Sequence, residues 1–113
     1  MVVDPKVLET LRCLDQPGQP SFLAEIIEIF FEDTPPRLAD LRRALAAGDV
    51  ETLTQISHTL KGSCGNFGAE AMQARCRELE LRGRGGTLDC APELIEEIEL
   101  EYGRVHAALS VYL

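Results

Sequence analysis

The chain has 113 residues and a formal net charge of −8; 45% of its residues are apolar and 27% are charged. This length holds one hydrophobic core, so we expect a single domain over residues 1–113 that folds by itself. The negative charge argues against a nucleic-acid or anionic-membrane partner, and no apolar run approaches the roughly 20 residues that cross a bilayer. We therefore expect a cytoplasmic protein whose partners are other proteins.

The first half of the chain shows helical periodicity throughout. A short amphipathic helix is predicted over about 5–14, before a stretch rich in turn residues. Ser21 is a good N-cap for a second helix, and a third helix can begin at Pro35 and Pro36, which need no amide hydrogen in a first turn. Gly48 is a natural left-handed end for that third helix. The sequence leaves open whether the second and third helices are collinear.

Three further helices are predicted over about 49–67, 69–82 and 92–112. Their apolar residues recur at three- and four-residue spacing, and Gly68 marks the turn between the first two. Short turns between neighbouring long helices favour antiparallel packing. The predicted fold is all-α, an up-down-up-down antiparallel four-helix bundle with a short extra N-terminal helix.

The four cysteines show no pattern of metal ligands. Cys13, Cys64, Cys76 and Cys90 form no C-x-x-C pair, and no histidine follows them at a zinc-ligand spacing. We predict no metal site and interpret the thiols as small buried residues in a reducing compartment.

The sequence suggests two possible locations for the phenylalanines, the core and the surface. Phe22, Phe30, Phe31 and Phe67 are expected in the core. An alternative is that one phenylalanine of the second helix stays at the surface, where it would meet an apolar helix of a partner. His106, in the last helix, is interpreted as a surface or rim residue.

One predicted helix carries a histidine on its outer face. At about 100° per residue, His58 lies nearly opposite the apolar arc of its helix. Gly62 follows one turn later on that face and Gly65 two turns later, while Lys61 lies to one side. Each interior glycine costs a helix about 1 kcal/mol relative to alanine. We interpret the two glycines as leaving room beside His58 for another protein.

The residues around His58 in the sequence favour only one kind of reaction for its ring. An exposed neutral imidazole can attack an electrophile that is already reactive, such as an aspartyl phosphate on a partner. Lys61, one turn away, can offset negative charge on the ring. No activating residue, glycine-rich phosphate loop or metal-binding carboxylate pair converges with His58. We predict a passive carrier without an ATP site or kinase activity, not an enzyme.

The run HTLKGSCGNFGA at 58–69 resembles the signature of histidine-containing phosphotransfer (HPt) domains, the carriers of multistep phosphorelays. The likeness extends to AAGD at the end of the third helix, to CRELE at 76–80 and to the final amphipathic helix. It implies that His58 is the phosphoacceptor, that Lys61 steadies the phosphoryl group, and that Gly62 permits docking of a response-regulator receiver domain. Gly65 matches a position that is often small in the family.

The resemblance also implies partners. These are a receiver domain and a sensor or hybrid histidine kinase, with Mg²⁺ supplied by the receiver and no cofactor on this chain. A charged exterior favours a monomer. Two alternatives stay open: a non-catalytic module that docks a receiver or kinase, against which the intact His58 argues, and an HPt module excised from a hybrid or chemotaxis-type kinase. The initial methionine and the end just past the last helical stripe favour a free-standing chain.

Overall fold

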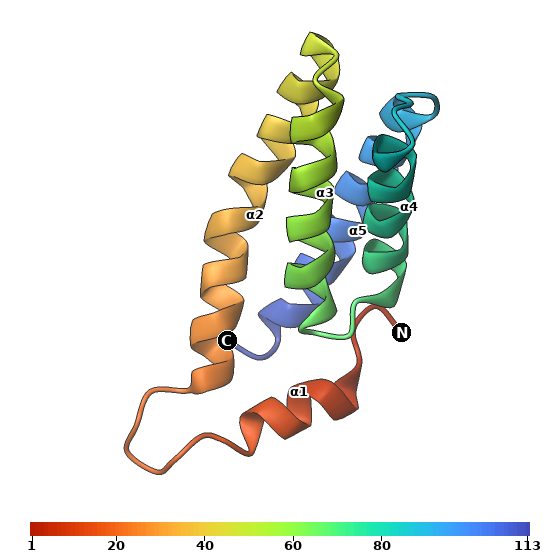
Figure 1. Cartoon of the computed structure of the whole chain (residues 1–113). Helices are drawn as coiled ribbons and strands as arrows, with labels where there is room; N and C mark the ends of the chain where they lie inside the picture. The colour runs from red at the N-terminus through yellow and green to blue at the C-terminus, as the bar shows by residue number, and fades with distance from the viewer.

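The computed structural model describes all residues 1–113, and five α-helices make up the fold (Figure 1). They are α1 (Pro5–Arg12), α2 (Phe22–Ala47), α3 (Val50–Gly65), α4 (Glu70–Arg84) and α5 (Ala91–Ser110). The last four run alternately up and down in a bundle, and α1 lies across one end of it (Figure 1). The predicted all-α four-helix bundle with an extra N-terminal helix is confirmed.

The core is one cluster of 22 buried apolar residues to which all five helices contribute. Within the bundle, α3 packs between α2 and α4, and α5 contacts both α4 and α2. Leu53, Leu60 and Cys64 place one side of α3 fully inside this core. Because an amphipathic helix buries only one face, the opposite face of α3 is left to solvent.

The second and third predicted helices are one continuous helix, α2, of 26 residues. Pro35 and Pro36 lie inside it, so the prediction that a new helix begins at them is wrong. A proline has no amide hydrogen, and each one therefore leaves a carbonyl of the preceding turn without its helical donor. Both prolines are exposed, and so is Glu32, which carries one of the two carbonyls. The buried residues Phe30 and Leu38 anchor the two halves of α2 to the same core.

The ends of the helices follow local sequence signals. Ser21 Oγ accepts a hydrogen bond from the amide three residues later at 3.2 Å, and Asp49 does the same for α3 at 3.1 Å. Gly48 ends α2 with a left-handed φ of 66°, a conformation that strains other residues. Gly68 has a φ of 65° in the turn between α3 and α4. The predicted N-cap of α2 and both predicted glycine turns are confirmed.

The cysteines divide between the core and the surface. Cys64 and Cys76 are buried, but Cys13 and Cys90 are exposed, so the interpretation as buried thiols holds only for the first pair. No group of three or more histidine, cysteine, aspartate or glutamate residues is arranged to hold a metal ion. No helix combines the length and the apolar content that a membrane crossing requires.

Candidate functional site

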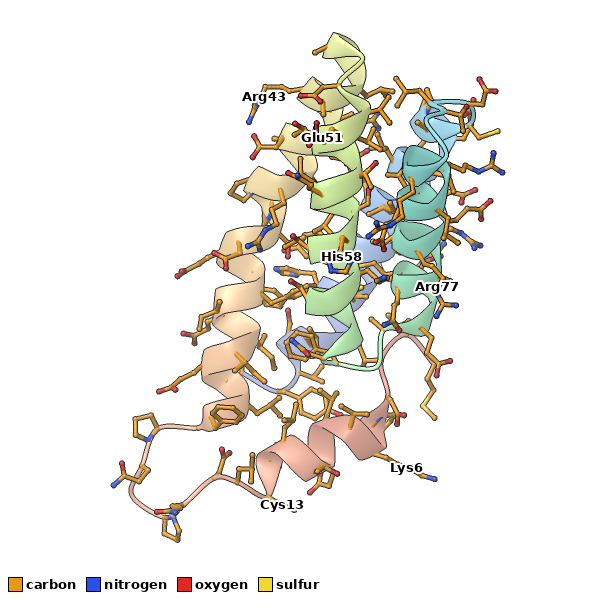
Figure 2. The ribbon with its side chains drawn as sticks, in the orientation of Figure 1. Lys6, Cys13, Arg43, Glu51, His58 and Arg77 are labelled. Atoms are coloured by element: carbon orange, nitrogen blue, oxygen red, sulfur yellow. The ribbon has the colours of Figure 1, made fainter.

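His58 lies near the middle of α3, on the side of the helix that faces away from the core (Figure 2). Its side chain is 61% exposed, whereas the nearby Ser57 and Leu60 are fully buried. The apolar periodicity of α3 predicts this orientation. An incoming molecule can reach the ring without any rearrangement of the bundle.

A carboxylate from the neighbouring helix contacts the ring. Oε2 of Glu80, on α4, lies 2.9 Å from Nδ1 of His58, although 22 residues separate the two along the chain. The Glu80 side chain is only 4% exposed, so a buried carboxylate lies beneath an exposed imidazole. Two cations complete its surroundings: Lys61 Nζ lies 2.6 Å from Oε1, and Arg84 donates to Oε2 at 2.6 Å.

These contacts keep Glu80 ionised. The hydrogen bond from Lys61 contributes most, those from Arg84 and His58 add to it, and against the opposing effect of burial they lower the pKa of Glu80 to about 2. An ionised carboxylate only accepts hydrogen bonds, so Nδ1 of His58 carries the hydrogen in their contact. In the neutral ring, Nε2 is then the nitrogen with a free lone pair. Glu80 therefore selects the tautomer in which Nε2 carries the free lone pair.

Lys61 and Arg84 flank the ring from two helices. Lys61, one turn after His58 on α3, is 28% exposed, and Arg84, in the last turn of α4, is 60% exposed. Both contact the carboxylate that contacts Nδ1 of the ring. The sequence predicts the position of Lys61; the structure adds that Lys61 is paired with a buried carboxylate.

The two glycines of the predicted site have different surroundings. A Cβ at Gly62 would meet nothing within 4 Å, so the surface one turn from His58 is open. A Cβ at Gly65 would lie 2.6 Å from Nε2 of Gln73 on α4. Gly65 faces a side chain of the neighbouring helix, and the interpretation that both glycines leave the outer face bare holds only for Gly62.

A small cavity lies between α2 and α3, towards the C-terminal end of α3. Its volume is about 170 Å³ and it is lined by Ile26, Ile29, Phe30, Asp33, Arg37, Ser63, Asn66 and Phe67. Of the three large apolar side chains that α2 contributes to this lining, Ile29 is the exposed one, at 55%.

The alternative of a surface phenylalanine beside His58 is not what the structure shows. Phe30 is buried, and Phe31 stacks on His106 of α5 with ring centroids 4.0 Å apart. Phe22 is exposed, but it is the first residue of α2 and lies at the end of the bundle next to α1 (Figure 1). His106 is an exposed residue, as expected.

Sequence reasoning missed Glu80 and Arg84. The available signal was the pattern of α4, because Glu80 follows Cys76 by four residues on the stripe that faces the core. A glutamate at a core-facing position is rarely buried without a partner. Periodicity could flag that position, but it could not show that one of the partners is a histidine on another helix.

The chemistry of the site follows from these contacts. An exposed imidazole with an unprotonated nitrogen can attack a reactive electrophilic centre. Lys61 and Arg84 can pair with anionic oxygens on the group that the ring receives. The arrangement favours the reversible transfer of an anionic group to and from the ring.

Comparisons with known proteins agree with this chemistry. The family model described as Hpt domain matches residues 25–108. Multistep phosphorelay regulator 1 of Schizosaccharomyces pombe is 31% identical over 98 residues, and histidine-containing phosphotransfer protein 2 of Arabidopsis thaliana is 27% identical over 99 residues. These alignments cover 83% and 81% of this chain.

A solved structure extends the similarity to the whole fold. The crystal structure of histidine-containing phosphotransfer protein B from Pseudomonas aeruginosa superposes with a TM-score of 0.88 at 32% identity, covering 98% of this chain and 93% of that chain. By contrast, the alignments span 33% and 61% of the lengths of the two curated relatives. The likeness thus extends well beyond the run at 58–69.

Proposed function

We propose, since the chain belongs to the Hpt domain family, that it is a phosphoryl carrier in a phosphorelay. His58 accepts a phosphoryl group from a receiver aspartate or from a histidine kinase, and passes it to the aspartate of a response-regulator receiver domain. The observation that carries this proposal is the exposed His58 ring, whose Nδ1 lies 2.9 Å from the buried carboxylate of Glu80. That contact leaves Nε2 as the attacking nitrogen.

The transfer step uses the lone pair of Nε2. This pair forms a bond to phosphorus while the bond between phosphorus and the aspartyl oxygen of the donor breaks, and the donor keeps the bonding electrons as a carboxylate. The hydrogen on Nδ1 stays in place, so the phosphorylated ring is an imidazolium that faces the carboxylate of Glu80. Onward transfer reverses the step: the bond between nitrogen and phosphorus breaks, and its electrons return to Nε2.

Lys61 and Arg84 stabilise the phosphoryl group on the ring. In the unphosphorylated site both cations pair with Glu80. A phosphoryl group on Nε2 brings a second anion to the same cations, and hydrogen bonds between charged groups are stronger than those between neutral groups. Phosphorylation therefore divides the two cations between Glu80 and the phosphoryl oxygens.

The partners supply the remaining parts of the reaction. A receiver domain brings the acceptor aspartate and Mg²⁺, and a sensor or hybrid histidine kinase feeds the relay. Gly62 lets the backbone of the receiver approach the ring, because nothing occupies the space above it. Gly65 contributes indirectly, since it lets α3 approach Gln73 of α4. The carrier acts as a monomer in the cytoplasm.

The test replaces His58 by glutamine. Because the His58 side chain is outside the core, His58→Gln should fold normally but take up no phosphoryl group from phosphoramidate or from a receiver phosphorylated with acetyl phosphate. His106→Gln, which changes the only other histidine, is the matched control and should be labelled as the wild type is. The label is identified by intact mass and by its lability in acid and stability in alkali.

Two results would contradict the proposal. Labelling of His58→Gln at the wild-type rate would assign the phosphoacceptor to another residue. Binding of a receiver by the wild-type chain, with no phosphoryl uptake from either donor, would favour the alternative of a non-catalytic docking module.

A further inference from the structure

The surface of α4 is basic, whereas the chain as a whole is acidic. This helix carries four of the nine arginines but only three glutamates, so it is net positive in a chain whose net charge is −8. Its ion pairs involve Arg75, Arg82 and Arg84. Arg77 is exposed and makes no ion pair, so its charge is available to a partner.

Arg77, Leu81 and Arg84 form one exposed row, which we name the α4 stripe. Their spacing of four and three residues puts them on the same side of the helix. Arg84 bonds to Glu80, which contacts His58, so the stripe runs alongside the site. Figure 2 shows Arg77 on α4 at a level similar to that of His58 on α3. Leu81 is 60% exposed and contributes little to the core.

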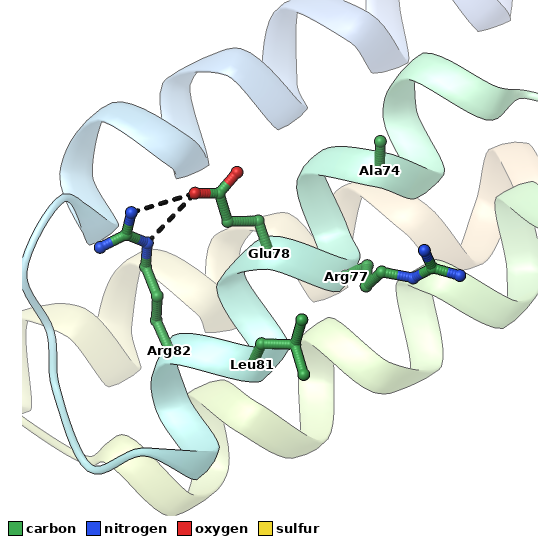
Figure 3. Close-up of a pocket in the computed structure, with 5 residues that line it drawn as sticks. All are labelled: Ala74, Arg77, Glu78, Leu81 and Arg82. Atoms are coloured by element: carbon green, nitrogen blue, oxygen red, sulfur yellow. Dashed lines mark hydrogen bonds and ion pairs between the residues drawn. The ribbon is translucent and has the colours of Figure 1, made fainter.

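The α4 stripe borders a shallow hollow of about 500 Å³ (Figure 3). The hollow is lined by Ala74, Arg77, Glu78, Leu81 and Arg82. Glu78 and Arg82 pair with each other at 3.0 Å, and Arg77 points away from this pair (Figure 3). The hollow therefore offers apolar side chains together with one cation whose charge is not yet balanced.

On the other side of His58, α2 presents the opposite charge. Glu28, Glu32 and Asp33 are exposed along its N-terminal half, and the one nearby cation, Arg37, pairs with Asp33 at 3.7 Å. His58 thus lies between a basic helix and an acidic one. A partner with an acidic edge is attracted in one orientation and repelled in the reverse orientation.

We propose that the α4 stripe is the docking surface for the acidic edge of the receiver domain that exchanges phosphoryl groups with His58. This inference rests on the proposed function, which brings a receiver and its acceptor aspartate over the ring. Carboxylates of the receiver then lie against Arg77, and an apolar side chain of the receiver covers Leu81. The stripe fixes the orientation of the receiver and selects among receivers by charge.

The test separates docking from chemistry by using two phosphoryl reactions. Phosphoramidate labels His58 without a protein partner. The receiver probe is the one, among the receiver domains of the source genome, to which phosphorylated His58 transfers fastest. We expect Arg77→Glu to raise the receiver concentration that gives the half-maximal transfer rate about tenfold, and to leave phosphoramidate labelling unchanged.

Control variants match each change. Lys6→Glu makes the same charge change at an exposed cation of α1 that also lacks an ion pair, and it should leave both reactions unchanged. Leu81→Ser should raise the half-maximal receiver concentration roughly fourfold through lost apolar contact. Leu100 of α5 is 59% exposed, close to the 60% of Leu81, and Leu100→Ser should leave the half-maximal receiver concentration unchanged. Raising the salt concentration should reduce the difference between Arg77→Glu and the wild type.

Three results would overturn the inference. Equal half-maximal concentrations for the wild type, Arg77→Glu and Leu81→Ser would remove the α4 stripe from the docking surface and leave the role of His58 intact. A wild-type chain that phosphoramidate cannot label would instead remove the proposed function. The third result is a wild-type dimer that dissociates when Arg77 is replaced by glutamate, while transfer to the receiver stays unchanged. It would show that the α4 stripe binds a second copy of the chain and not the receiver.

Discussion

Glu80 lies on the side of α4 that faces α3, next to the fully packed Leu79. Its burial is tolerated because Lys61, Arg84 and His58 satisfy both of its carboxylate oxygens. The same contacts orient the imidazole of His58. One side chain therefore joins two helices and also selects the nitrogen of His58 that keeps a free lone pair.

The ion pairs of Glu80 predict a pH dependence of stability. The pKa of Glu80 is lowered from 4.5 to about 2 in the folded chain. A lowered folded-state pKa stabilises the fold above the unfolded-state pKa, and this stabilisation is lost as the pH falls towards the folded-state value. We expect Glu80→Gln to reduce the free energy of unfolding by about 1–2 kcal/mol at pH 7.

The difference between Glu80→Gln and the wild type should shrink as the pH falls from 4.5 to about 2. Urea denaturation at several pH values measures it. A difference that stays constant across this range would contradict the ion-pair explanation and would indicate that Glu80 stabilises the fold by packing alone.

Whether a glycine stabilises or destabilises this fold depends on the backbone conformation at its position. Gly62 is inside α3 and Gly48 ends α2 with a φ of 66°, and a Cβ would meet nothing within 4 Å at either one. Space is therefore not limiting, and the backbone alone decides the effect of a side chain. The two positions form a matched pair.

The same substitution at this pair should have opposite effects. We expect Gly62→Ala to raise the free energy of unfolding by about 0.5–1 kcal/mol, because alanine favours the helix interior. We expect Gly48→Ala to lower it by about 1–2 kcal/mol, because alanine is strained in a left-handed conformation. Thermal denaturation of both variants measures the sign. A stabilising Gly48→Ala would contradict the assigned end of α2, and a destabilising Gly62→Ala would contradict the open helix-interior position of Gly62.

The continuity of α2 shows how packing overrides a local signal. Proline is favoured in the first turn of a helix, so Pro35 and Pro36 predict that a new helix begins there. The core contacts of Phe30 and Leu38, on either side of the prolines, hold both halves of α2 in one line instead. The sequence could predict the helical segments, but it could not weigh two missing hydrogen bonds against this packing.

At the scale of the whole molecule, α1 closes one end of the bundle. Leu8 of α1 is fully buried in the common core. The amide of Asp4 donates to the carbonyl of Phe67 at 3.1 Å, which ties the N-terminal segment to the turn between α3 and α4. The first helix is therefore part of the fold and is remote from the face that carries His58.

Removing this anchor should destabilise the fold without changing the chemistry. We expect Leu8→Ala to lower the free energy of unfolding by about 2–5 kcal/mol through lost burial and a residual cavity. Leu14→Ala, at a leucine that is 61% exposed, should change it by less than about 0.5 kcal/mol. Urea denaturation measures both, and phosphoramidate labelling of folded Leu8→Ala should match the wild type. An unaffected Leu8→Ala would show that α1 does not belong to the cooperative unit.

The sequence by itself determined the features that depend on neighbours within a turn or two: the helical segments, their glycine and serine ends, and the outward direction of His58 with Lys61 and Gly62 beside it. Helical periodicity and capping are local, so these can be read along the chain. Only the tertiary structure decided that Glu80 reaches His58 across 22 residues, that Gly65 faces Gln73, and that α2 is unbroken. These depend on the rotation and spacing of whole helices, which are set by the packing of the shared core.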